Sequence, residues 1–202
     1  MAKLLIYYAH PGHSHSRVNR AMAEMASKVE GVTFCDLYAT YPRFNIDIDK
    51  EQEKLLNHDV FLFQHPLFWY STPPLVKEWI DLVLEHGFAY GSGGDKLHGK
   101  TMMNAISAAG PEEAYTEKGY QHYSLRTFLT PLEQTARLCH MNYSAPYVLY
   151  SSLKVNEDQD IPQHVQGYKM LIESIRDDHF DFEKAFSTDV LNATNLPMRH
   201  EV

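Results

Sequence analysis

Leu4-Leu5-Ile6-Tyr7-Tyr8-Ala9 is a continuous apolar run, and it ends in His10-Pro11-Gly12. Such a run is typical of a strand buried on both faces, as the central strands of a parallel sheet are. The residues that follow, 16–30, carry apolar side chains at helical spacing, and Gly31 stands where a helix commonly ends. The start of the chain therefore predicts a buried strand followed by a helix.

Strand and helix patterns continue to alternate along the chain. Further strands are expected over residues 32–38, 59–64, 101–109 and 147–153, and further helices over residues 49–58, 73–86, 124–140 and 161–176. Pro131 is expected to kink the helix that contains it or to mark its true start. This alternation implies right-handed crossovers and an open, parallel, doubly wound α/β sheet. We expect one domain over residues 1–180 and a C-terminal tail over residues 181–202, partly helical or irregular.

Composition and charge exclude several classes of protein. The 202 residues are 44% hydrophobic and 22% charged, which are globular values, so a disordered or collagen-like chain is excluded. The net charge of −8 argues against non-specific binding of nucleic acid, which needs a basic surface. Cys35 and Cys139 lack the spacing of a zinc or disulfide framework. The first apolar run is too short for a signal peptide or membrane span, which predicts a soluble, cytoplasmic protein.

The segment Gly94-Asp95-Lys96-Leu97-His98-Gly99-Lys100-Thr101 matches the phosphate-loop pattern GxxxxGK[ST]. In that motif the loop must follow a strand and open a helix, so that the helix N-terminus faces the phosphates. Here the segment follows a predicted helix and opens a predicted strand. We therefore interpret it as a surface turn rather than as a nucleotide site.

Ligands of open parallel sheets bind at the carboxyl ends of the strands, and the first such loop is rich in histidine. His10, His13 and His15 precede Ser16 and Arg17 in this loop, in a chain that has 12 histidines. Imidazoles can bind a metal ion, although no carboxylate stands at a useful spacing. Alternatively, Ser16 caps the next helix, and its free amides, Arg17 and partly charged imidazoles bind a phosphate. An ordinary capped helix is the third interpretation.

The second and third strand-end loops have unusual composition. Residues 65–74 contain the consecutive aromatics Phe68, Trp69 and Tyr70, which can cap the core, form a dimer contact or flank a flat ring. Residues 107–110 are small, so a ligand can approach their backbone closely. Tyr115 and His122 follow in a short polar segment, as candidate site residues or as ordinary surface residues.

These loops carry a resemblance to a known family. The chain resembles the flavodoxin-like NAD(P)H:quinone oxidoreductases, and among them the ancillary oxidoreductases of glutathione-gated potassium-efflux systems. The resemblance runs from about residue 3 to residue 180. Its segments are Tyr8-Ala9-His10-Pro11, residues 37–38 with residues 41–48, residues 64–81 with their proline-aromatic run before Lys77-Glu78-Trp79, and His86-Gly87-Phe88-Ala89-Tyr90-Gly91.

The resemblance implies a five-stranded flavodoxin-like sheet in the order 2-1-3-4-5 and a flavin site at the strand ends. The cofactor is expected to be FMN, whereas mammalian relatives use FAD. Hydride transfer is assisted by residues that correspond to Tyr115 and His122. The family's usual third loop is richer in Thr and Gly than the Ser-Ala-Ala-Gly of this chain. The expected flavin contacts are His10, Ser16, Arg17, Val18, Asn19, Pro66, Leu67, Phe68, Trp69, Tyr70, Ser107, Ala108, Ala109 and Gly110.

Three functions follow as alternatives from the resemblance. The first is a two-electron, ping-pong quinone reductase, in which hydride passes from NAD(P)H through FMN to a quinone. The second is an ancillary subunit that activates a glutathione-gated potassium/proton antiporter, peripherally bound to the inner face of the membrane, with oxidoreductase activity secondary. The third is a one-electron flavodoxin carrier, although the first loop lacks the Thr-Gly-rich pattern of that group. The resemblance also implies a homodimer.

Overall fold

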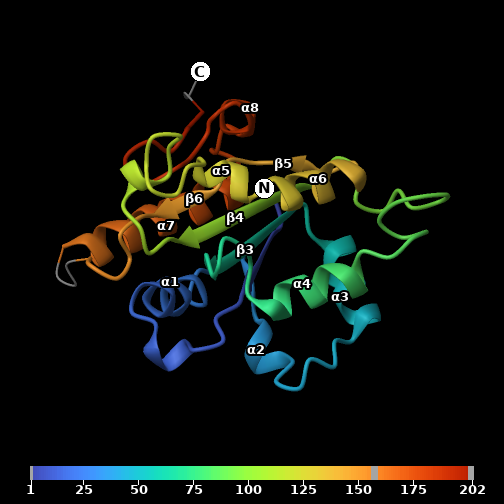
Figure 1. Cartoon of the computed structure of the whole chain (residues 1–202). Helices are drawn as coiled ribbons and strands as arrows, with labels where there is room; N and C mark the ends of the chain where they lie inside the picture. Colours follow the sequence, from blue (N-terminus) through green and yellow to red (C-terminus); the bar gives the residue numbers. More distant parts are fainter. Residues whose placement is uncertain (1, 156–158, 200–202) are drawn as a thin grey trace.

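The computed structural model describes residues 2–155 and 159–199, and a parallel sheet forms their centre (Figure 1). Its strands pair in the order β2-β1-β3-β4-β5, and β6 pairs with β4 beyond the end of β5. The predicted α/β class and strand order are thus confirmed, with the fifth strand divided into two short pieces. The strands are β1 (Leu4–Tyr8), β2 (Thr33–Asp36), β3 (Val60–Pro66), β4 (Thr101–Ser107), β5 (Asn142–Tyr143) and β6 (Tyr147–Leu149).

Helices cover both faces of the sheet. Val18 and Met22 of α1 and Leu171 of α7 share one apolar cluster with Leu4 and Leu62 of the strands. The helices α3, α4 and α6 contribute to the cluster on the other face (Figure 1). The helices are α1 (Val18–Ala26), α2 (Leu37–Thr40), α3 (Ile48–Asn57), α4 (Pro74–Val83), α5 (Leu125–Phe128), α6 (Thr130–Leu138), α7 (Asp160–Arg176) and α8 (Phe182–Phe186), with 3₁₀ turns η1 (His13–His15) and η2 (Glu112–Ala114).

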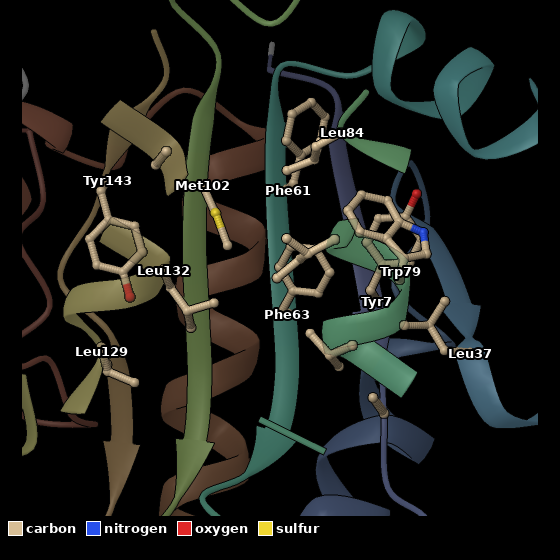
Figure 2. Close-up of a cluster of buried hydrophobic side chains, with 14 of the residues drawn as sticks. Tyr7, Leu37, Phe61, Phe63, Trp79, Leu84, Met102, Leu129, Leu132 and Tyr143 are labelled. Atoms are coloured by element: carbon tan, nitrogen blue, oxygen red, sulfur yellow. The ribbon is translucent and has the colours of Figure 1, made fainter. Parts of the chain in front are cut away.

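Aromatic side chains fill the core between the central strands and α4 (Figure 2). The ring of Trp79 lies 4.9 Å from that of Tyr7 and 5.2 Å from that of Phe63. Each of these residues is almost fully buried. Large buried aromatics of this kind each remove 150–250 Å² from water, so they fix α4 against β1 and β3. The segment between β3 and α4, residues 67–73, is therefore held at both ends.

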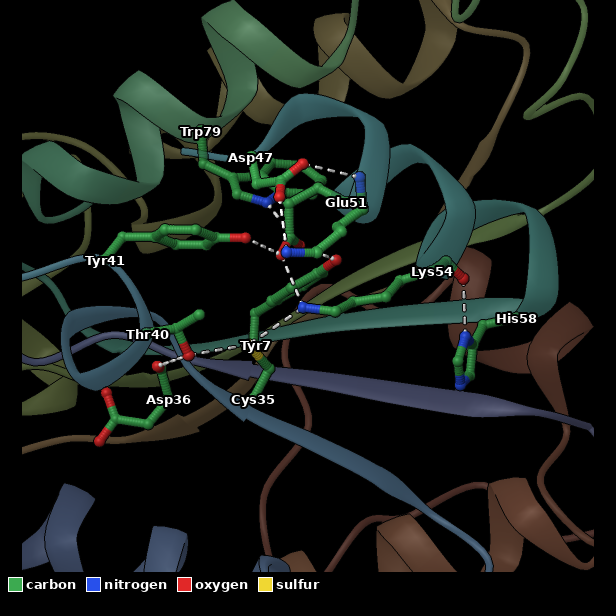
Figure 3. Close-up of polar contacts among 11 residues, drawn as sticks. Tyr7, Cys35, Asp36, Thr40, Tyr41, Asp47, Glu51, Lys54, His58 and Trp79 are labelled. Atoms are coloured by element: carbon green, nitrogen blue, oxygen red, sulfur yellow. Dashed lines mark hydrogen bonds and ion pairs between the residues drawn. The ribbon is translucent and has the colours of Figure 1, made fainter. Parts of the chain in front are cut away.

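A buried carboxylate ties α3 to the same core (Figure 3). Glu51 has no exposed side-chain surface and accepts hydrogen bonds from Tyr7 Oη at 2.6 Å, Tyr41 Oη at 2.5 Å and Trp79 Nε1 at 3.0 Å. Lys54 Nζ adds an ion pair at 2.6 Å. Burial alone raises the pKa of the Glu51 carboxyl, but these hydrogen bonds outweigh it, and the pKa lies below its ordinary value.

Several local expectations changed in the structure. The strand predicted over residues 32–38 ends at Asp36, because the Asp36 carboxylate accepts a hydrogen bond from Ala39 N at 3.0 Å and caps the short helix α2. The helix predicted over residues 124–140 is two helices, and Pro131 lies in the first turn of the second, as predicted. Residues 96–99 form a turn before β4, which confirms the interpretation of the phosphate-loop match.

The residues after α7 pack on the sheet domain. Phe180, Ala185 and Leu191 are buried in the cluster that also contains α1 and α7. Leu191 N donates to the carbonyl of Pro146 at 2.8 Å, and Val148 N donates to the carbonyl of Leu191 at 2.8 Å. The segment therefore continues the hydrogen bonding beyond β6. Residues 200–202 of the predicted tail lie outside the described residues.

Candidate functional site

A cavity of about 460 Å³ opens at the carboxyl ends of β1, β3 and β4. Ligand pockets commonly have 300–1,000 Å³, so this volume suits a small-molecule ligand. Ten of the predicted contact residues line this cavity: His10, Ser16, Arg17, Val18, Asn19, Pro66, Leu67, Phe68, Ser107 and Ala109. A second cavity of about 270 Å³ shares Leu67 and Ala109 with the first. The three loops thus meet in one region, where the topology of an open sheet places a site.

The N-terminus of α1 borders the first cavity with its backbone amides free. In the described part of the chain, the N–H groups of Val18, Asn19 and Arg20 donate to no acceptor, and no side chain caps the helix. The expectation that Ser16 caps this helix is wrong: Arg17 is the N-cap residue, and Ser16 follows the 3₁₀ turn η1 in extended conformation. An uncapped helix N-terminus beside a cavity is suited to an anion.

His10 and His65 carry less charge than the sequence suggested. Burial, with a smaller contribution from His13, lowers the pKa of His10 below its usual value. Gly12 N donates to His10 Nδ1 at 3.1 Å, which leaves the proton of the neutral ring on Nε2. His65 lies inside β3, fully buried, and burial lowers its pKa as well. At neutral pH these two imidazoles therefore offer hydrogen bonds rather than positive charge.

A buried side-chain amide at the first cavity has an acceptor atom without a hydrogen-bond donor. Asn19 is 2% exposed, and its Nδ2 donates to Ser107 Oγ at 2.6 Å. Gln64 Nε2 in turn donates to the carbonyl of Asn19 at 2.8 Å. The Asn19 Oδ1 acceptor has no partner within residues 2–155 and 159–199. A buried acceptor without a donor costs about 1–3 kcal/mol. A ligand hydroxyl that donates a hydrogen bond to Asn19 Oδ1 would remove this cost.

The aromatic loop forms a strained hairpin turn at the cavity edge. Phe68 and Ser71 exchange two backbone hydrogen bonds of 3.0 Å, and between them Trp69 and Tyr70 have φ of 46° and 65°. Such turns favour Asn and Gly, and bulky residues in left-handed conformation cost about 1–3 kcal/mol each. Trp69 is nevertheless 92% exposed, so core packing does not account for it. Strain of this kind indicates a functional constraint on the turn.

Some backbone amides of the strand-end loops are already hydrogen-bonded, and others are free. The amides of Leu67 and Ala108 already donate to the carbonyls of Ser107 and Leu149, at 2.9 and 2.8 Å. By contrast, the amides of Trp69 and Ala109 have no acceptor among the described residues. The predicted residue Ala108 is fully buried and does not line either cavity. Free donors for a ligand are therefore concentrated on the aromatic turn and at Ala109.

The second cavity brings Trp69, Tyr70, Gly110 and Tyr115 together. A side-chain carbon on Gly110 would lie 2.9 Å from Tyr120 Oη and 3.2 Å from the Tyr115 ring, so glycine is needed for these rings to approach. Burial raises the pKa of the Tyr115 phenol, which stays protonated at neutral pH. His122, the other predicted catalytic residue, is exposed and is not among the lining residues.

The expected flavin contacts left out several residues that line the cavities. Gly12 and His15 belong to the first loop, Tyr120 and Gln121 to the segment after Tyr115, and Ser152 and Leu153 to the segment after β6. Arg17 donates to the carbonyl of Leu153 at 3.1 Å, which brings this fourth segment over the first cavity. The position of residues 151–153 in the sequence could have identified them. They follow a strand of the parallel sheet, and ligands bind where such strands end.

Comparison with known proteins assigns the family. Residues 2–172 match the family model described as the flavodoxin-like fold. The chain belongs to the flavodoxin-like fold family. A relative of this flavodoxin-like protein, the glutathione-regulated potassium-efflux system ancillary protein KefG of Serratia proteamaculans (strain 568), is 47% identical over 166 residues, which are 82% of this chain and 90% of KefG.

Solved structures agree with this assignment. The general stress protein 14 of Treponema denticola, in complex with FMN, is 33% identical with a TM-score of 0.81, over 86% of this chain and 99% of that one. An NADPH-quinone reductase from P. pentosaceus has a TM-score of 0.73 at 24% identity, over 84% and 96% of the two chains, which shows a shared fold. Among the described residues of this flavodoxin-like protein, no helix is long and apolar enough to cross a membrane.

Proposed function

We propose that this flavodoxin-like protein is an FMN-dependent NAD(P)H:quinone oxidoreductase. The observation that carries the proposal is the continuous site at the strand ends, with an uncapped helix N-terminus at one end and a strained aromatic turn at the other. The overall reaction is NAD(P)H + H⁺ + quinone → NAD(P)⁺ + hydroquinone, a transfer of two electrons. FMN bound at this site would supply the two-electron carrier chemistry that links the two substrates.

The residues present fit FMN. The free amides of Val18, Asn19 and Arg20 suit its phosphate, and the unpartnered Asn19 Oδ1 suits a hydroxyl of its ribityl chain. The aromatic turn, with its free amides, suits the flat ring and its polar edge. The FMN complex of the 33% identical structure supports the same cofactor. We therefore assign the phosphate to the N-terminus of α1, at residues 18–20, and the ring to residues 67–70.

The chain's own groups have defined tasks in this reaction. The Tyr115 phenol, which burial keeps protonated, donates a hydrogen bond to the acceptor oxygen as negative charge develops there. The amides of the aromatic turn do the same for the ring of the cofactor. The hairpin at residues 68–71, closed by two backbone hydrogen bonds, orients the two reactants.

A direct test is NAD(P)H consumption with a quinone such as 1,4-benzoquinone, together with the mass of the flavin extracted from the protein. The proposal predicts FMN, turnover that requires both substrates and parallel initial-rate lines typical of ping-pong kinetics. A protein that binds neither FMN nor FAD contradicts it. Extraction of FAD instead would retain the reductase and correct the cofactor.

The similarity to KefG favours a second function as an ancillary subunit. At 47% identity over 90% of KefG, the surface as well as the fold is expected to be related. We propose that this protein also docks, as a cytoplasmic peripheral subunit, on a potassium/proton antiporter at the inner face of the membrane. Co-purification with the antiporter and a change in potassium efflux on deletion of the gene test this role. A protein that never co-purifies and leaves the flux unchanged would retain only the reductase function.

The rim of the site suggests a homodimer. Trp69, Tyr120 and Leu153 expose 92%, 64% and 73% of their surfaces around the two cavities. Exposed apolar groups that cluster in this way are typical of interfaces. We propose that a second copy covers them and completes the flavin pocket. Sedimentation analysis of the wild type and of Trp69→Ser tests this, with a shift from dimer to monomer expected in the variant.

A further inference from the structure

The second cavity contains an amide where a histidine was expected. Its lining residues are Leu67, Trp69, Tyr70, Ala109, Gly110, Tyr115, Tyr120 and Gln121. His122 is exposed and is not among the lining residues; it has a φ of 62° and closes a turn in which its amide donates to the carbonyl of Gly119 at 2.9 Å. The polar side-chain groups of the lining residues are therefore the phenols of Tyr70, Tyr115 and Tyr120, the Trp69 indole N–H and the Gln121 amide.

We propose that Gln121, together with Tyr115, contacts the electron acceptor in the second cavity, and that His122 takes no part in the reaction. This inference rests on the proposed quinone reductase function and assigns the acceptor subsite within it. Gln121 N donates to the carbonyl of Ala114 at 3.1 Å, so the backbone of Gln121 is anchored beside Tyr115. The side-chain amide makes no hydrogen bond within the described ranges, and it is partly buried at the cavity wall.

The chemistry of a quinone explains why an amide suits this position. A quinone oxygen only accepts hydrogen bonds, whereas the hydroxyl of the hydroquinone product also donates. Glutamine carries both a donating NH₂ group and an accepting carbonyl, so it can pair with either form by rotating its terminal amide. Tyr115 Oη can likewise donate to the quinone and accept from the hydroquinone. The subsite therefore holds an uncharged, planar acceptor between aromatic walls without a change of its own charge.

The ionisable groups around the subsite lead to a distinct pH profile. The phenols of Tyr70 and Tyr120 contribute to the raised pKa of Tyr115. The Tyr150 ring lies 5.5 Å from the Tyr115 ring, and Glu112 contributes to the raised pKa of Tyr150. No cavity-lining group has an ordinary pKa between 5 and 8. Acceptor binding is thus expected to be constant from pH 6 to pH 8, whereas a catalytic histidine would give a titration in this range.

Two adjacent substitutions test the inference. Gln121→Leu removes the amide at similar size, and His122→Leu is the matched control at the next residue. The acceptor Kd is measured without turnover, from the perturbation of the FMN spectrum when 1,4-naphthoquinone is added to oxidised protein. Loss of one hydrogen bond predicts a Kd raised about three- to tenfold in Gln121→Leu and unchanged in His122→Leu. Reduction of bound FMN by NADPH alone, followed by stopped flow, should be unchanged in His122→Leu.

A further variant adds a charge-based test. Gln121→Glu keeps the size and the acceptor but removes the donor, so the quinone Kd should rise with pH as the carboxyl ionises, whereas the wild-type value stays constant. If His122→Leu weakens acceptor binding and Gln121→Leu does not, the inference is overturned while the reductase function stands. If the wild type binds FMN but no quinone, the inference and the quinone as acceptor fall together. If it binds no flavin at all, the proposed function fails first.

Discussion

Substitution of the buried Glu51 carboxylate by the neutral amide in Glu51→Gln gives a direct test of how the core is held. The amide presents one acceptor where the carboxylate serves four donors, so Trp79 Nε1, which can only donate, loses its partner. Lys54 also loses a counter-ion to which its Nζ lies within 2.6 Å. Removing one partner of a buried ion pair typically costs 3–5 kcal/mol, and we expect a loss of about 3 kcal/mol.

The assay is urea unfolding followed by tryptophan fluorescence, with Glu53→Gln as the matched control. Glu53 is exposed on the same helix, so its substitution should change the free energy of unfolding by less than about 0.5 kcal/mol. A loss of about 3 kcal/mol in Glu51→Gln corresponds to a Tm about 6–12 °C lower for a chain of this size. Equal stabilities of the two variants would refute the account of this cluster.

The difference in stability between wild type and Glu51→Gln should also depend on pH, in a direction that the pKa of Glu51 fixes. The folded pKa of Glu51 is lowered relative to the unfolded value of about 4.3, so its stabilising contribution is fully present above that value. The contribution is lost as the pH falls through the folded pKa. The stability gap between wild type and Glu51→Gln should therefore be constant between pH 6 and pH 8 and shrink below about pH 4. A gap that persists unchanged into acid would contradict the lowered pKa.

Three further predictions concern the site. Trp69→Ala should lower FMN retention and turnover at least tenfold while the free energy of unfolding of the monomer changes by less than about 1 kcal/mol, since this side chain is 92% exposed in the single chain; FMN titration, and urea unfolding of the separated monomer, check both. Asn19→Ala removes the unpartnered acceptor, and the FMN Kd measured by fluorescence quenching should rise about three- to tenfold, with Asn57→Ala as an exposed control. Because burial lowers the pKa of His10, its ring is neutral at pH 7, so the FMN Kd of His10→Gln should show the same pH dependence as wild type from pH 7 to pH 8.

Most of the fold was predictable because its decisive signals are local. The apolar runs of β1, β3 and β4 and the helical stripe of α4 follow directly from the sequence, and Pro131 marks the start of α6 as expected. The short elements were less accessible. The capping of α2 by Asp36 competes with strand propensity over a few residues, and the division of the fifth strand into β5 and β6 depends on neighbouring segments.

The sequence predicted which loops form the candidate site. It did not predict which side chains of those loops line the cavities or which of them are charged. Strand ends of a parallel sheet meet at one edge, so residues 10–19, 66–70 and 107–110 were expected together, and most of them line the two cavities. Side-chain environment is a tertiary property: of two adjacent residues, Gln121 lines the second cavity and His122 is exposed outside it. The same limit applies to charge, since the burial that lowers the pKa of His10 and His65 has no local sequence signal.

The visible absorption spectrum of the purified protein, reconstituted with FMN under anaerobic conditions, tests the central claim most directly. The account predicts that FMN co-migrates with the protein through gel filtration, that NAD(P)H bleaches its absorption and that added quinone restores the colour without oxygen. Failure to retain FMN would contradict the assignment of the strand-end cavities as a flavin site. Retained FMN that NAD(P)H does not bleach would leave a flavin-binding protein and contradict the oxidoreductase.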